Sequence, residues 1–347
     1  MTIELADVRE LHRFDVAALQ AYLEARVPGF RGPITVRQFR GGQSNPTYYL
    51  TTGDGAYVLR RKPPGKLLPS AHAVDREYRV LTALQGTGVP VPLTYVLCED
   101  GDVIGTPFYL MEYVEGRLFR DAALPGASPA ERTAIYDSMN EVLARLHGLD
   151  WKALGLGDFG KPGNYYARQI HRWTQQYRAS ETEKIPAMEE LIAWLPGHIP
   201  AADETTLVHG DYRPGNMLMH PAEPRVVAVL DWELSTLGHP FADLGYFCMP
   251  YRLGSEWEGF RAENLAALGI PSEEEFLAAY CRRTGRSGIP HWEFYLAFAM
   301  FRLGAIAQGI MGRVLAGTAN DPNARERGER ARPLAEAGWR LVSRLRA

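Results

Sequence analysis

Apolar and polar positions follow two different periods along this 347-residue chain. In the first third, short apolar runs separated by turn residues predict β-strands, at 34–39, 56–60, 94–98 and 108–114. Helical spacing dominates later, with apolar stripes at 135–146, 166–177, 273–283 and 291–315. The pattern predicts an α+β protein with two parts, a small β-rich N-terminal lobe (residues 1–114) and a larger, mainly helical C-terminal lobe (residues 115–347).

Polar residues stand at the ends of three short apolar runs between residues 207 and 233. The first run leads into His209-Gly210-Asp211, Asn216 comes directly before the second, and the third ends on Asp231. A carboxylate at the mouth of an apolar strand is costly to bury unless a cation holds it. A bound divalent metal is the simplest explanation of this pattern.

The spacing His-x-Asp-x-x-x-x-Asn, here His209, Asp211 and Asn216, matches a motif of phosphoryl transfer. In kinase-type transfer the Asp accepts the proton of the attacking hydroxyl, while the Asn and a later Asp bind Mg²⁺. We therefore expect Asp211, Asn216 and Asp231 to be catalytic, with Asn216 and Asp231 as metal ligands and Glu233 as a secondary ligand. An ordinary turn between two strands is the alternative for this motif taken alone.

A glycine-rich turn follows the first predicted strand, with Gly42, Ser44 and Asn45 between two strands. Glycine lets a backbone approach an anion closely, and backbone N–H groups can then point at phosphates. The turn is therefore a candidate nucleotide-binding loop. A plain hairpin turn is the alternative.

The next strand carries Arg60 where kinases place a phosphate-binding Lys. A helix is expected after an N-cap at Ser70, with an apolar stripe from Val74 to Leu84. Glu77 falls inside that stripe, so its carboxylate needs a cationic partner. We expect Arg60 and Glu77 to form the strand-to-helix ion pair that kinases use at their nucleotide site. Lys62 is an alternative phosphate contact, and a Glu77 side chain that reaches water is the alternative to the pair.

Composition limits the possible partners and compartment. The formal net charge is −3, from 38 basic and 41 acidic residues, so no overall field favours nucleic acid or an anionic membrane. Cysteines number three, Cys98, Cys248 and Cys281, and are too few and too scattered for a disulfide framework. The N-terminus lacks the apolar core of a signal peptide, and the apolar run 294–301 is too short to span a bilayer. We expect a cytoplasmic protein, with an oligomeric state that the sequence does not reveal.

The ordered set of motifs resembles the aminoglycoside phosphotransferase and choline kinase family, whose short signature is HGDxxxxN followed by a hydrophobic strand and Asp. The similarity covers roughly residues 30 to 315. It implies a two-lobed protein-kinase-like fold, ATP and Mg²⁺ as cofactors, and Gly42, Ser44 and Asn45 as the phosphate loop. It also implies a hinge after residue 114, where the backbones of Glu112 and Val114 would bind adenine.

The detailed pattern, including GGQSNPTYYL and VLRRKPPG, looks closest to the branch of this family that occurs alone or fused ahead of an acyl-CoA dehydrogenase. That branch is implicated in phosphorylating hydroxyacyl-CoA thioesters, which makes a CoA ester one expected hydroxyl acceptor. The basic residues from Arg168 to Arg178 would suit such an anionic acceptor. Two alternatives stay open: an aminoglycoside or amino-alcohol kinase, and a nucleotide-binding pseudokinase without turnover.

Overall fold

The structure is a computed structural model that describes residues 5–40, 45–53, 55–64, 73–254, 257, 259–260, 263–319 and 323–346. The chain forms two compact units. Unit 1 comprises Met1–Phe119, Leu154–Leu156 and Asn216–Ser235, and unit 2 comprises Arg120–Ala153, Gly157–Gly215 and Thr236–Ala347. Unit 1 therefore includes the segment that carries Asn216 and Asp231. The expected domain boundary at residue 114 stays a prediction.

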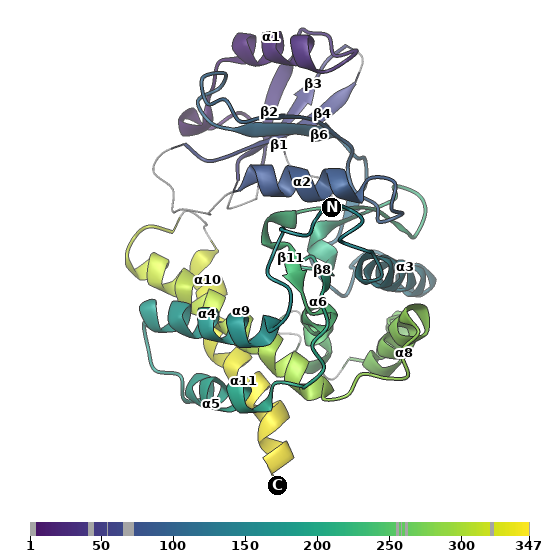
Figure 1. The fold of residues 1–347 in the computed structure, drawn as a ribbon, viewed down its shortest axis with the longest axis vertical. Helices are drawn as coiled ribbons and strands as arrows, with labels where there is room; N and C mark the ends of the chain where they lie inside the picture. Colours follow the sequence, from purple (N-terminus) through teal and green to yellow (C-terminus); the bar gives the residue numbers. More distant parts are fainter. Residues whose placement is uncertain are drawn as a thin grey trace. The chain divides into compact units, whose positions relative to one another are not determined.

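A six-stranded antiparallel sheet forms the centre of unit 1, in the order β1-β2-β3-β4-β6-β5. The strands are β1 (Leu5–Ala6), β2 (Thr35–Phe39), β3 (Thr47–Thr51), β4 (Ala56–Arg61), β5 (Thr94–Cys98) and β6 (Phe108–Glu112). Helices α1 (Val16–Arg26) and α2 (Val74–Leu84) cover opposite faces of this sheet (Figure 1). Helix α2 covers the apolar stripe from Val74 to Leu84, while the N-cap expected at Ser70 lies outside the described residues, and the predicted strands agree with the observed ones to within two residues.

A second, smaller sheet in unit 1 pairs strands that are far apart in the sequence, in the order β10-β9-β7. Its strands are β7 (Arg117–Leu118), β9 (Met217–Met219) and β10 (Val226–Val229). Gly116 allows the close approach, because a Cβ there would lie 2.8 Å from the Met219 carbonyl oxygen. The chain before and after this hairpin holds Asn216 and Asp231, so the sheet fixes both.

Unit 2 is mainly helical and is built around α9 (Trp292–Leu315), whose first seventeen residues are nearly all buried. Its other elements are α3 (Pro129–His147), α4 (Tyr165–Ala179), α5 (Pro186–Trp194), β8 (Thr206–Val208), β11 (Thr236–Gly238), α6 (Pro240–Cys248), α7 (Leu265–Leu268), α8 (Glu273–Thr284), α10 (Ala324–Glu329) and α11 (Ala331–Ser343). Strands β8 and β11 pair antiparallel, and Figure 1 shows α6 beside them.

Short 3₁₀ turns occur along the described chain, at Glu10–His12, Leu195–His198, Pro214–Asn216, Trp232–Leu234, Met249–Arg252 and Arg344–Arg346.

Helix α9 is the one element of the described chain that is long and apolar enough, by length and composition, to cross a membrane. Within the protein, however, 78% of its most apolar 18-residue window is buried. Arg302 does not end the apolar helix, which continues to Leu315. A core helix of a globular protein passes the same test, and its packing shows that α9 serves as one.

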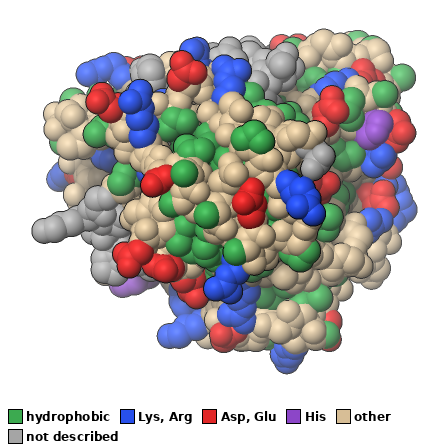
Figure 2. Space-filling view, turned by 90° about the horizontal axis from the view of Figure 1, so that it is seen from above, with side chains coloured by type: hydrophobic (Ala, Val, Ile, Leu, Met, Phe, Trp, Pro, Cys, Tyr) green, Lys and Arg blue, Asp and Glu red, His purple; other side chains and the backbone are tan. Residues whose placement is uncertain are grey.

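The surface shown in Figure 2 carries Lys and Arg side chains interspersed with Asp and Glu. This mixture agrees with the small net charge of −3. A continuous basic face of the kind that binds nucleic acid is not seen in that view.

Candidate active site

Arg60 is the central cation of a carboxylate cluster in unit 1. It lies in β4, opposite Thr47 of β3 and Tyr109 of β6. Its Nε atom lies 2.9 Å from Oε2 of Glu77, and its Nη2 atom lies 2.7 Å from Oδ1 of Asp231. The ion pair predicted between Arg60 and Glu77 is therefore present.

Glu233 is the third carboxylate of this cluster, with Oε2 at 3.4 Å from Nη2 of Arg60. The Glu77 side chain is 2% exposed, so burial raises its pKa, and Arg60 opposes that shift. Burial lowers the pKa of Arg60, but Glu77 and Asp231 outweigh burial and raise it above its usual range. Arg60 thus keeps its charge and neutralises part of the surrounding negative charge.

Asp231 stands in a strained turn directly after β10. Its backbone has φ = 65°, in the left-handed region that residues other than glycine seldom adopt. The next residue, Trp232, is 1% exposed and donates from its indole N–H to the carbonyl of Val229 at 2.9 Å. The buried Trp232 therefore locks the turn that directs the Asp231 carboxylate to Arg60.

Asn216 is fixed beside the same strand end. Its carbonyl oxygen accepts a hydrogen bond from the Leu230 N–H at 2.8 Å, and Leu230 immediately precedes Asp231. Asn216 is 7% exposed, whereas the Asp231 side chain is 36% exposed. The two predicted metal ligands therefore lie at neighbouring ends of the small sheet.

The oxygens of Asn216 and Asp231 suit Mg²⁺, a hard cation that proteins bind through one or two carboxylates together with substrate phosphates. Among the described residues, no group of three or more His, Cys, Asp or Glu side chains is arranged to hold a metal by itself. Glu233, the secondary metal candidate, is paired with Arg60 in this structure.

Asp211 lies in unit 2, in the loop after β8. Its backbone N–H donates to Nδ1 of His209 at 3.1 Å, and its Oδ2 lies 3.5 Å from Nε of Arg213. The Tyr246 hydroxyl also forms a hydrogen bond with the Asp211 carboxylate, and burial together with this charge raises the pKa of Tyr246. Asp211 is therefore oriented from several sides, as a proton acceptor requires.

Asp243, in the first turn of α6, anchors this loop. Its two carboxylate oxygens accept hydrogen bonds from the N–H groups of His209 (2.6 Å) and Gly210 (2.7 Å). Burial would raise the pKa of Asp243, but hydrogen bonds, above all from His147, outweigh it and lower the pKa. Asp243 is therefore a structural residue that holds the loop amides before Asp211.

His147 takes part in this anchor, which sequence reasoning missed. It is the last residue of α3, and we expect such a residue to interact with the helix dipole. In the structure its Nε2 lies 3.4 Å from Asp243 and its Nδ1 lies 2.8 Å from the Tyr280 hydroxyl. Both partners are more than 90 residues away in the chain, so no local pattern could have revealed them.

The nucleotide-binding residues predicted from family resemblance are described only in part. Gly42 and Ser44 lie outside the described residues. Asn45, two residues before β3, is 2% exposed. The Glu112 N–H donates to the Leu93 carbonyl at 2.7 Å, so this N–H is already engaged within unit 1.

The basic residues expected to favour an anionic acceptor are mostly engaged elsewhere. Arg168 donates to the backbone carbonyls of Gly163 and Lys161. Arg178 forms ion pairs with Glu181 and Glu189. These two arginines therefore support the α4 region, and do not argue for a CoA ester.

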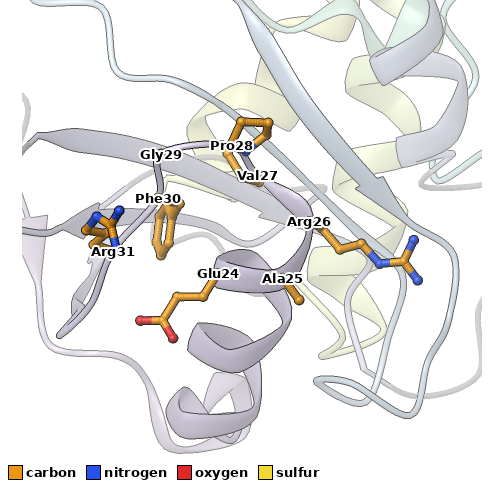
Figure 3. A pocket seen from close by; sticks show the side chains of 8 residues that line it. All are labelled: Glu24, Ala25, Arg26, Val27, Pro28, Gly29, Phe30 and Arg31. Atoms are coloured by element: carbon orange, nitrogen blue, oxygen red, sulfur yellow. The ribbon is translucent and has the colours of Figure 1, made fainter.

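A shallow pocket at the end of α1 contains none of the predicted site residues. Glu24, Phe30 and Arg31 are among its lining residues (Figure 3). The Glu24 carboxylate accepts hydrogen bonds from the Gly32 N–H (2.9 Å) and the Gln20 amide (3.0 Å). These contacts give the pocket a structural role in the turn before β2.

Comparison with known proteins identifies the class of this protein, a kinase-like phosphotransferase. Residues 35–298 match the model of the phosphotransferase enzyme family, so the chain belongs to that family and is a small-molecule kinase by class. A solved Ralstonia eutropha JMP134 protein, provisionally called an aminoglycoside phosphotransferase, is 55% identical with a TM-score of 0.88. The match covers 96% of this chain and 99% of that one.

More distant structures share the fold alone. A thermostable mutant of aminoglycoside phosphotransferase APH(4)-Ia, in complex with AMP-PNP and hygromycin B, is 17% identical with a TM-score of 0.61, covering 93% of this chain and 98% of that one.

Among curated proteins, acyl-CoA dehydrogenase family member 10 of Mus musculus is 49% identical over 97% of this chain. The chain spans 32% of that relative's length, so the relative's name describes a much longer protein.

Proposed function

We propose that this protein transfers the γ-phosphate of ATP to a hydroxyl group of a small molecule in an Mg²⁺-dependent reaction. The observation that carries the proposal is the Arg60 cluster, in which one guanidinium contacts both Glu77 and Asp231. An Arg fork can contact two carboxylates and a phosphate at once, which a single ammonium group cannot do with the same geometry. We assign the remaining donor capacity of this guanidinium to the phosphates.

Asn216 and Asp231 would hold the metal, which neutralises phosphate charge when bound. The strained backbone at Asp231 and the buried Trp232 support this role, because they fix the carboxylate before any ligand arrives. With Asp231 as a metal ligand, Glu77 and Glu233 would still hold the Arg60 guanidinium beside the phosphates.

Asp211 would accept the proton of the acceptor hydroxyl. Its contacts with Tyr246, Arg213 and the His209 loop hold the carboxylate in one orientation. Positioning of this kind brings the hydroxyl oxygen into line with the phosphorus, which is the main contribution a protein makes to phosphoryl transfer. Gly42, Ser44 and Asn45, and the backbones of Glu112 and Val114, complete the proposed nucleotide site.

For the acceptor we propose a hydroxyacyl-CoA. The support is the 49% identity to acyl-CoA dehydrogenase family member 10, a protein whose name refers to CoA thioesters. A second candidate is an aminoglycoside, favoured by the provisional name of the 55% identical Ralstonia protein. We also propose a cytoplasmic location, since Cys98, Cys248 and Cys281 are all free and buried.

A coupled ADP-release assay across hydroxyacyl-CoAs, aminoglycosides and amino alcohols tests the proposal. We expect ADP release that depends on the acceptor and is greatest with a hydroxyacyl-CoA. Release only with aminoglycosides or choline would identify the other kinase class. Tight ATP binding with no release from any acceptor would indicate a pseudokinase.

A further inference from the structure

Arg302 of α9 is a buried cation without an anionic partner among the described residues. It is 7% exposed, and its guanidinium lies against two aromatic rings. The guanidinium carbon lies 5.5 Å from the ring centre of Trp173 and 5.8 Å from that of Tyr246. Buried charges in proteins are normally paired, so a buried guanidinium without an ion pair is a candidate contact for an anion that a ligand supplies.

Other buried or half-buried arginines of the protein differ from Arg302 in this respect. Arg60 contacts three carboxylates, and Arg286 forms a bidentate pair with Glu204. The buried Arg61 donates to the carbonyls of Ile104 and His12. Arg302 has no comparable ion pair or hydrogen bond with any described residue.

The position of Arg302 connects it to the proposed base. Tyr246, which lies against the Arg302 guanidinium, forms a hydrogen bond with Asp211 through its hydroxyl group. Trp173, the second ring beside Arg302, also contacts the exposed Arg172. The guanidinium carbon of Arg172 lies 5.4 Å from the centre of the Trp173 ring. The guanidinium groups of Arg172 and Arg302 thus both contact the Trp173 ring, and Arg302 also contacts Tyr246, which binds Asp211.

We propose that Arg302, oriented by Trp173 and Tyr246, binds an anionic group of the acceptor, so that the acceptor carries a phosphate or carboxylate beside the hydroxyl-bearing part. The planar fork of arginine suits both groups. This inference rests on the proposed phosphotransfer and specifies the class of its acceptor. A polycationic aminoglycoside would be repelled at the same place.

Direct binding measured by calorimetry tests the inference without requiring turnover. The probes are CoA, 3-hydroxybutyrate, 3-hydroxybutyryl-CoA and the uncharged N-acetylcysteamine thioester of 3-hydroxybutyrate. We expect at least one anionic probe to bind the wild type, and Arg302→Met to weaken that binding by about 10-fold to 100-fold, as loss of a charged hydrogen bond does. Loss with CoA compounds alone identifies phosphate as the anion, and loss with 3-hydroxybutyrate identifies carboxylate.

Matched variants keep the test independent of folding. Arg313→Met, an exposed position on the same helix, should leave binding unchanged. Arg302→Met should keep or raise the melting temperature, because it removes a buried unpaired charge. If Arg302→Met does not fold, Arg302→Lys serves instead, and it should show weaker binding because it lacks the fork.

The failures of the two proposals are distinguishable. Failure of every anionic probe to bind the wild type, or equal binding by Arg302→Met, would overturn the anion site even if ADP release is observed. Anion binding that depends on Arg302, with no ADP release from any acceptor, would refute the phosphotransferase proposal and leave the anion site standing.

Discussion

Arg60 shows how one side chain can tie together distant parts of unit 1. Its Nε contacts Glu77 on α2, while its Nη2 contacts Asp231, which lies 171 residues further along the chain. The periodicities of β4 and α2 suffice to predict the first contact, because each places its residue on an inward face. The contacts with Asp231 and Glu233 depend on the tertiary fold, and no local pattern contains them.

We predict that Arg60→Ala lowers the free energy of unfolding by about 3–5 kcal/mol, because it leaves the buried Glu77 carboxylate without a counter-charge. Urea denaturation at neutral pH measures this effect. Lys62→Ala is the matched control: Lys62 Nζ lies 3.8 Å from the exposed Asp75, and such a surface pair contributes about 0–1 kcal/mol. Equal effects of the two substitutions would show that Arg60 does not support Glu77.

Asp211 is the residue on which the chemistry depends most directly. We predict that Asp211→Ala lowers kcat by about 10²- to 10⁴-fold, the usual contribution of a general base, and leaves ATP affinity nearly unchanged. Steady-state ADP release and nucleotide binding measure the two quantities. Asp137→Ala, an exposed carboxylate paired with Arg283, is the control. Turnover near the wild-type value in Asp211→Ala would remove Asp211 from this role.

At the scale of elements, α6 illustrates how a buried histidine can serve as a helix cap. His239 is 1% exposed, and its Nδ1 accepts the Phe241 N–H at the start of α6. Burial lowers the pKa of His239 to about 4. The cap of α6 and the packing of the buried ring therefore both require the neutral form of the His239 imidazole.

The consequence is a loss of stability in acid. Since the folded-state pKa lies below the unfolded value, the unfolded chain binds more protons between about pH 6.5 and pH 4. The stabilisation is thus complete above about pH 6.5 and declines as the pH falls to 4, by up to about 3 kcal/mol. His239→Asn keeps a capping oxygen and should flatten this part of the pH profile. An unchanged slope in His239→Asn would assign the acid sensitivity to other groups.

The helical stripe of α4 shows where sequence reasoning reaches its limit. Its apolar side, with Tyr166, Ile170 and Trp173, is buried as its period predicts. Its basic residues, however, bind backbone carbonyls and neighbouring carboxylates that a single sequence cannot place. The stacking of Arg302 on Trp173 joins α9 to α4 and could be recognised only in three dimensions.

For the whole molecule, the predicted α+β, kinase-like fold is confirmed, and so is membership of the phosphotransferase enzyme family. Strand and helix assignment succeeded because unit 1 alternates clear β periods with one strongly amphipathic helix, α2. The roles of Asn216, Asp231 and the phosphate loop remain predictions, since they concern a nucleotide and a metal. Those roles can be decided only by a measurement of transfer itself.

The most direct measurement follows the γ-phosphate. Wild-type protein is incubated with γ-labelled ATP, Mg²⁺ and 3-hydroxybutyryl-CoA, and label in the acceptor is quantified with and without EDTA, alongside Asp231→Ala. We predict labelled acceptor with the wild type and Mg²⁺, and none with EDTA or with Asp231→Ala. Equal, Mg²⁺-dependent labelling by Asp231→Ala would contradict the assigned metal ligand, and no labelled product from any hydroxyl acceptor would contradict the phosphotransferase itself.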